Sequence, residues 1–168
     1  MTPGTEANVP LLDDASVELI ESARSAKLVA AADRSLQAGG VHAYACRVAP
    51  DRSVITVVLS RSQSATVLDS IAATRRIALV ACHIKSYQTV QLKGDDAIIL
   101  PPTDADRQAV VDYCRGFVEY TTELGYDGAA MRAHMACERD DAIVVRFTGR
   151  RAFNQTPGPS AGQPLAPA

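Results

Sequence analysis

Residues 41–59 read VHAYACRVAPDRSVITVVL, and the fold depends on how this stretch is arranged. Two mainly apolar runs, 41–49 and 54–59, flank the four residues Pro50-Asp51-Arg52-Ser53. The second run is rich in β-branched residues, which favour strands, and proline stands where a type I turn accepts it. The stretch therefore predicts two antiparallel strands joined by a short turn.

The same pattern analysis extends to both sides of this hairpin. Strands are predicted at 28–32, 77–82, 87–93, 98–100 and 142–147, and helices at 14–25, from Ser62 or Ser64 to about Arg75, 104–124 and 127–136. Residues 33–40, which end in Gly39-Gly40, are predicted to form a loop. About six strands, mostly linked by hairpins and accompanied by helices, predict an α+β barrel. A doubly wound parallel sheet is disfavoured, because Gly39-Gly40 alone is no dinucleotide fingerprint.

Composition narrows the class of protein. The chain has 168 residues, 47% hydrophobic and 21% charged, which is typical of one globular domain. We expect a flexible N-terminus over 1–13, a main domain over 14–150 and an extended C-terminal tail over 151–168. No apolar run approaches the ~20 residues of a membrane span, and the N-terminus lacks the pattern of a secretory peptide, so a cytoplasmic protein without a membrane partner is expected.

Basic residues and cysteines exclude two further classes of partner. The net charge is −2, and basic residues occur singly or in pairs such as Arg75-Arg76 and Arg150-Arg151, without the basic stripe that nucleic-acid binding requires. The four cysteines are widely spaced, with no C-x-x-C pair and no nearby histidine cluster. No metal site is predicted.

Two short motifs resemble a known family. Residues 87–94 read YQTVQLKG and residues 153–162 read FNQTPGPSAG, and together they resemble bacterial pyridoxamine 5'-phosphate oxidase-like proteins. The order of elements from about Val17 to Phe147 also fits that family's FMN-binding split barrel. The resemblance implies a six-stranded antiparallel split β-barrel with flanking helices, and a homodimer with two FMN sites at the subunit interface.

The resemblance also implies where FMN would bind. In the family, an arginine and a lysine five residues apart precede the first hairpin turn, and the corresponding positions here are His42 and Arg47. After the turn, hydroxyl and basic residues bind the phosphate together with the free N–H groups of the following helix. The corresponding residues here are Ser60, Arg61, Ser62 and Ser64.

Other candidates lie on the next hairpin and in the tail. Gln91 and Lys93 match the family segment whose glutamine reaches the flavin; alternatively, they form the exposed face of an edge strand. The segment from Lys85 to Tyr87 could line the flavin edge or form a polar turn. The tail is expected to be an extended arm along the dimer or flavin groove, with simple disorder as the alternative.

These features favour an FMN-dependent oxidoreductase that acts on a small molecule. No acid/base pair or nucleophile constellation is visible, so no catalytic residue is assigned, and a non-catalytic flavin-binding or stress-related protein remains an alternative. A split barrel that uses the deazaflavin F420 or haem is another, although no histidine follows Ala142 to bind haem iron. Because the chain has no tryptophan, it lacks the C-terminal substrate residues of the true oxidase, and vitamin B6 oxidation is not expected.

Overall fold

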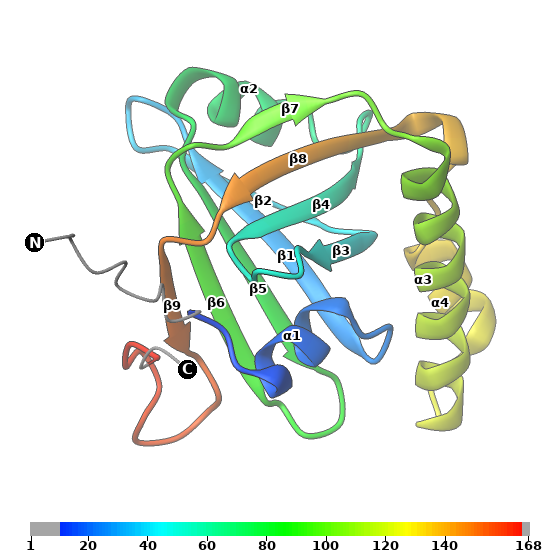
Figure 1. Cartoon of the computed structure of the whole chain (residues 1–168). Helices are drawn as coiled ribbons and strands as arrows, with labels where there is room; N and C mark the ends of the chain where they lie inside the picture. The colour runs from blue at the N-terminus through cyan, green and yellow to red at the C-terminus, as the bar shows by residue number, and fades with distance from the viewer. Residues whose placement is uncertain (1–10, 166–168) are drawn as a thin grey trace, which may run out of the picture.

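The computed structural model describes residues 11–165, so most of the predicted flexible N-terminus (1–13) and the end of the tail lie outside the described residues. The chain forms the following elements, of which Figure 1 labels the α-helices and the strands. They are α1 (Asp14–Glu21), β1 (Ser25–Ala32), β2 (Ala38–His42), β3 (Ala45–Val48), β4 (Val54–Ser60), α2 (Ala65–Thr74), β5 (Ile77–His83), β6 (Thr89–Gly94), β7 (Ile98–Leu100), α3 (Asp104–Glu123), α4 (Gly128–His134), the 3-10 helix η1 (Arg139–Asp141), β8 (Ala142–Thr148) and β9 (Arg151–Asn154).

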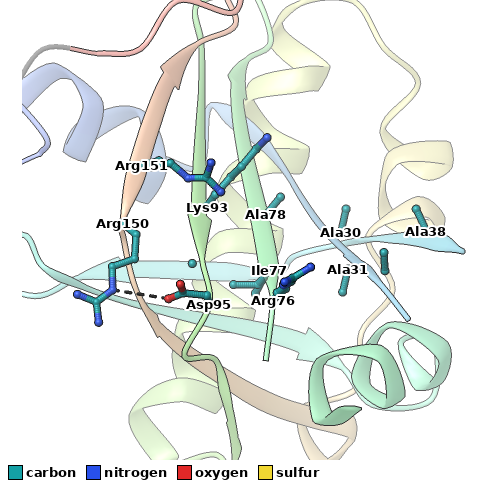
Figure 2. Close-up of a pocket in the computed structure, with 12 residues that line it drawn as sticks. Ala30, Ala31, Ala38, Arg76, Ile77, Ala78, Lys93, Asp95, Arg150 and Arg151 are labelled. Atoms are coloured by element: carbon teal, nitrogen blue, oxygen red, sulfur yellow. Dashed lines mark ion pairs between the residues drawn. The ribbon is translucent and has the colours of Figure 1, made fainter. Parts of the chain in front are cut away.

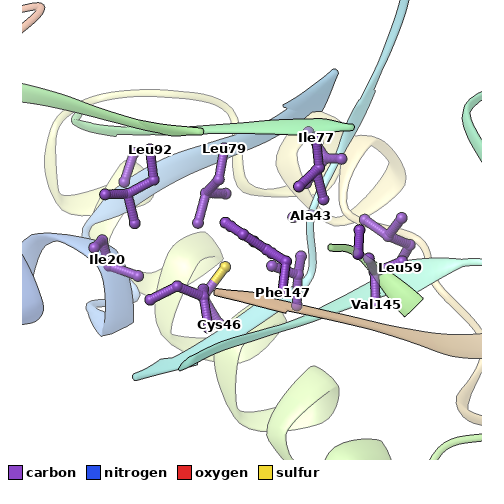
Figure 3. Packing of buried hydrophobic residues seen from close by; sticks show 14 of the residues in the cluster. Ile20, Ala43, Cys46, Leu59, Ile77, Leu79, Leu92, Val145 and Phe147 are labelled. Carbon is purple, nitrogen blue, oxygen red and sulfur yellow. The ribbon is translucent and has the colours of Figure 1, made fainter. Parts of the chain in front are cut away.

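The strands form two antiparallel sheets. One has the order β2-β1-β5-β6-β9 and the other the order β3-β4-β8-β7. Figure 3 shows the main core between them, where Leu79 and Leu92 of the first sheet face Val145 and Phe147 of the second. All four side chains are at most 2% exposed, so the apolar contact between the sheets stabilises the fold.

The predicted α+β class is confirmed, but the six-stranded barrel is wrong. Residues 11–165 contain nine strands in two open sheets. The predicted strand 41–49 is divided between the sheets, because the Ala43 N–H donates to the Lys27 carbonyl of the first sheet (2.9 Å) and the Tyr44 N–H to the Val58 carbonyl of the second (2.8 Å). The predicted loop at Gly39-Gly40 is also wrong, since both glycines lie in the edge strand β2.

The turn and the helix starts agree better with prediction. β3 and β4 form the predicted hairpin, with Ala45 opposite Val58 and Val48 opposite Ile55. α3 begins at a capping box in which the Thr103 side chain accepts from the Asp106 N–H and the Asp106 side chain accepts from the Thr103 N–H. No helix within residues 11–165 is both long enough and apolar enough to cross a membrane.

The end of β6 marks a close approach between the two sheets. A Cβ atom built on Gly94 would lie 2.5 Å from Cδ2 of Phe147 and 2.8 Å from the carbonyl oxygen of Thr148. Because the second of these atoms belongs to the backbone of β8, it cannot move aside cheaply. Only glycine therefore fits at position 94.

The tail begins as a strand of the first sheet. β9 pairs with β6, and the chain then turns back so that Pro164 forms a bridge with Phe153. The Leu165 N–H donates to the Ala152 carbonyl (2.9 Å), and Leu165 packs against the main core. The described part of the tail therefore covers the β9 edge of the sheet.

Candidate functional site

The five-stranded sheet has one face toward the core and an opposite, outer face. Cross-strand pairing arranges the outer face in rows. One row, here called the glutamine row, contains His42, Leu28, Val80, Gln91 and Phe153. The next, the basic row, contains Gly40, Ala30, Ala78, Lys93 and Arg151. Leu28 is 52% exposed, which shows that the outer face is open at its centre.

A pocket of about 570 Å³ lies at the end of this face, beside the basic row. Figure 2 shows its lining, with Lys93 and Arg151 on neighbouring strands and Arg76 between this pair and Ala30, Ala31 and Ala38. We call it the basic pocket. Its charged residues are Arg76, Lys93, Arg150, Arg151 and Asp95, and its floor includes Ala30, Ala31, Ala32, Ala38 and Ala78.

Among residues 11–165, only one cation of the basic pocket has a carboxylate partner. Arg150 pairs with Asp95 (3.7 Å) and Asp96 (3.4 Å), whereas Arg76, Lys93 and Arg151 form no ion pair with any residue from 11 to 165. The Lys93 ammonium lies 5.0 Å from the centre of the Phe153 ring, a weak cation–π contact. The pocket therefore carries an excess of positive charge.

Gln91 has a fixed neighbour on the same face. The Gln155 amide nitrogen donates to the Gln91 amide oxygen at 3.4 Å, so the other end of the Gln91 amide is left as a donor. The tail therefore contacts the glutamine row directly. Gln91 and Lys93, both predicted site residues, share one face of β6.

The Ser60–Ser64 segment, predicted to bind phosphate, surrounds a carboxylate of the chain itself. Asp141 accepts from the Ser62 N–H (3.0 Å), the Ser62 hydroxyl (2.7 Å) and the Ser60 hydroxyl (2.5 Å). Although partial burial opposes ionisation, the bonds from Ser60 and Ser62 outweigh it and hold the pKa of Asp141 below its usual value. The donors expected for phosphate are thus already bonded to an anion.

The other residues of that segment are arranged differently. The Arg61 side chain is exposed, and its backbone N–H donates to the Asp141 carbonyl (2.7 Å). Ser64 is the residue before the first turn of α2, but its buried hydroxyl has no partner among the described residues and does not cap the helix. The role of Ser60–Ser64 in phosphate binding stays a prediction, and a phosphate there would compete with Asp141.

The Arg47 side chain is bound to helix α3. Its guanidinium forms an ion pair with Asp106, whose side chain is only 4% exposed and also accepts from Thr103. Burial opposes ionisation of Asp106, but the Thr103 and Arg47 contacts lower its pKa overall. Arg47 faces Thr56 on β4, four residues or roughly 13 Å along the strand from Ser60.

His42 and Tyr87 lie in two other environments. The His42 ring packs edge-on against Tyr44 (5.3 Å) and Phe117 (6.0 Å), with its buried Nε2 unpartnered among residues 11–165. Burial, followed by the charges of His134 and Lys27, lowers the pKa of His42 to about 4, so it is neutral at pH 7. Tyr87 is 62% exposed in the turn between β5 and β6. The predicted site residues therefore do not form one cluster.

Sequence reasoning missed Asp141 and the three pocket arginines, Arg76, Arg150 and Arg151. The signal for the arginines was present as two basic pairs next to predicted strand ends. Their convergence depends on β9 pairing with β6, which the pairs alone do not reveal. Within residues 11–165, no group of three or more His, Cys, Asp or Glu side chains is placed to hold a metal ion.

Comparison with known proteins gives a fold but no sequence relative. No family model matches the chain, and no curated protein matches it. HupZ of Group A Streptococcus matches at 14% identity and a TM-score of 0.54, over 90% of this chain and 99% of its own. A candidate pyridoxamine 5'-phosphate oxidase of Lactobacillus delbrueckii matches at 17% identity and 0.53, over 88% and 97%.

The chain has the fold of the pyridoxamine 5'-phosphate oxidase-like proteins. A structure named F420 reductase also matches, at 12% identity and a TM-score of 0.53, over 84% of this chain and 98% of its own. At such identities the match concerns the fold alone. The resemblance seen in the two sequence motifs is confirmed at that level.

Proposed function

We propose that the protein binds FMN on the outer face of the five-stranded sheet and acts as an FMN-dependent oxidoreductase on a small molecule. The observation that carries this proposal is the order of chemical groups along that face. Leu28 and Val80 are apolar, Gln91 offers an amide, and Lys93 with Arg151 offers positive charge. FMN has the same sequence of parts, an apolar ring, a hydrogen-bonding edge and a phosphate.

The residues of the face would hold and orient the cofactor, which supplies the redox chemistry when bound. Gln91 is suited to donate to a carbonyl oxygen of the ring, because Gln155 occupies its own oxygen. Leu28 and Val80 would cover the apolar part of the ring and exclude water from it.

We further propose a cytoplasmic homodimer whose second copy covers the outer face and completes the site. The exposed Leu28 beside Val80 forms an apolar centre that a solvent-facing sheet would not favour. A second copy placed over the face would enclose the bound ring and shield that centre from water. Light scattering at micromolar concentration should report about twice the 17.8 kDa chain mass, and a persistent monomer would contradict the proposal.

The absorption spectrum of the purified protein, followed by titration with FMN, tests cofactor binding. We expect saturable quenching of flavin fluorescence by the wild-type protein. Bleaching of bound FMN by a reduced nicotinamide nucleotide would support an oxidoreductase, whereas binding without reduction by any donor would favour a non-catalytic flavin protein. A wild-type protein that binds neither FMN nor riboflavin would refute the proposal.

The deazaflavin F420 is the second candidate. Its support is the fold shared with the F420 reductase, together with the three cations of the basic pocket that lack carboxylate partners in the described part of the chain. F420 carries carboxylates in addition to phosphate and would make fuller use of these charges. Parallel titrations with FMN and F420 would distinguish the two cofactors, and a haem spectrum would exclude both.

A further inference from the structure

We infer that the phosphate of the cofactor binds in the basic pocket, between Lys93 and Arg151, and not at the Ser60–Ser64 segment. This inference rests on the proposed function, because it places one part of the proposed ligand. It assigns a phosphate-binding role to Arg76 and Arg151, which the family motifs do not single out.

The first support is a repulsive pair inside the sheet. Lys93 and Arg151 are direct cross-strand partners on β6 and β9, so their Cβ atoms are about 4.5–5.5 Å apart. Like charges at such positions destabilise a sheet. No carboxylate among residues 11–165 forms an ion pair with either side chain. A bound dianion would turn this repulsion into two attractive contacts.

The second support is the shape and charge of the surroundings. The floor next to the pair is made of alanines, which leave room for a ligand within the pocket of about 570 Å³. Arg76, directly before β5, supplies a third cation between the pair and Ala30, Ala31 and Ala38 (Figure 2). Asp95 is the one carboxylate among residues 11–165 that lines the pocket, and Arg150 already pairs with it.

The third support is the spacing along β6. Gln91 and Lys93 are two residues apart on one face, which corresponds to roughly 7 Å along the strand. A ring placed over the glutamine row can therefore extend its ribityl chain along the strand to a phosphate at the basic row. The ring and phosphate then lie on one continuous face.

The Ser60–Ser64 segment lacks this complementarity. Its hydroxyl and N–H donors are bonded to Asp141, and a phosphate entering there would face that carboxylate at short range. Displacing Asp141 would leave its carboxylate without its hydrogen-bond donors. In the basic pocket a phosphate dianion would instead meet three cations that have no carboxylate partner among residues 11–165.

The test compares FMN with riboflavin, which lacks the phosphate, in four variants of the full chain. Arg151→Gln and Lys93→Gln should each weaken FMN binding about ten- to a hundred-fold, the usual effect of losing a charge-assisted hydrogen bond, and leave riboflavin unchanged. Arg61→Gln should change neither. Arg132→Gln, which removes an exposed arginine from α4, is the matched control for loss of charge.

The outcomes separate the two proposals. A selective loss of FMN in Arg61→Gln with none in Arg151→Gln would overturn the inference and place the phosphate at Ser60–Ser64. Equal losses for FMN and riboflavin in Arg151→Gln would also overturn it, because the phosphate would not be involved. If the wild type binds neither flavin, the proposed function fails. The site itself is then tested with inorganic phosphate by ³¹P NMR: line broadening lost in Arg151→Gln supports an anion site, and no broadening overturns it.

Discussion

The Ser60–Ser62 loop and the basic pocket represent two opposite electrostatic situations in one molecule. In the loop, three donors converge on Asp141, so an anion is built into the chain. In the pocket, three cations lack a carboxylate partner among residues 11–165. The hydrogen bonds to Asp141 stabilise the folded protein. The cations of the pocket repel one another, and an anionic ligand would relieve that repulsion. Hydroxyls and an arginine before a helix are therefore no sufficient mark of a phosphate site.

The largest expected effect concerns the loop. Asp141→Ala should lower the free energy of unfolding by about 2–3 kcal/mol, because the buried Ser60 hydroxyl and the Ser62 donors lose a charged acceptor. Urea denaturation measures the change. Asp140→Ala, at the exposed neighbouring position, should stay within about 0.5 kcal/mol of the wild type. Equal stability of the two variants would mean that the Asp141 contacts are of no energetic importance.

A smaller loss of stability is expected when the tail is removed. Truncation after Phe153 deletes Gln155 and Leu165, and we expect it to lower the free energy of unfolding by roughly 1–2 kcal/mol through lost hydrogen bonds and packing. FMN retention or dimerisation should weaken more than folding, because Gln155 contacts the glutamine row. Melting curves, flavin content and light scattering on the same preparation test this, and unchanged flavin affinity and assembly would show that the tail has no part in the site.

The stability of the protein in acid should depend on Asp141 in the loop. The pKa of Asp141 is lower in the folded protein than in the unfolded chain, so its contribution is fully present above the unfolded value and is lost as pH falls through the folded one. Asp106 should contribute in the same direction. Stability should therefore fall below about pH 4, and less steeply in Asp141→Asn. A variant with the wild-type acid profile would exclude Asp141 as a cause.

The smallest effect concerns the basic pocket without ligand. Arg151→Gln should raise the free energy of unfolding by about 0.2–1 kcal/mol, because it removes the repulsion with Lys93. The substitution breaks no ion pair within residues 11–165. This increase in the free energy of unfolding should be smaller in 1 M salt, where the Debye length is about 3 Å. The same variant is expected to bind FMN less well, so stability and affinity should change in opposite directions. A loss of stability would indicate that Arg151 has a structural role.

Local signals in the sequence predicted the local structure. The turn at Pro50 and the strands around it, the start of α2 after Ser64 and the start of α3 after Thr103 all follow from nearby residues. The crossing between sheets at Ala43 and Tyr44 does not, because a mainly apolar run without glycine or proline at the crossing does not indicate which sheet each half will join.

The candidate site was only partly predictable for a related reason. Gln91 and Lys93 belong to one short motif and share one strand, so their common face follows from the two-residue period of a strand. Asp141 is 81 residues from Ser60, and Arg151 meets Lys93 only because the tail joins the sheet. Contacts of this kind depend on topology, which charge and hydropathy patterns do not encode.

The close approach at Gly94 gives the motif QLKG a second meaning. Its glycine is required by the backbone of β8 and the ring of Phe147, whatever ligand the outer face binds. The motif therefore combines a packing constraint at its last position with the ligand contacts that we propose for its first and third. Proteins that share the glycine need share only the way in which their sheets meet, whereas a shared glutamine and lysine would indicate a common cofactor.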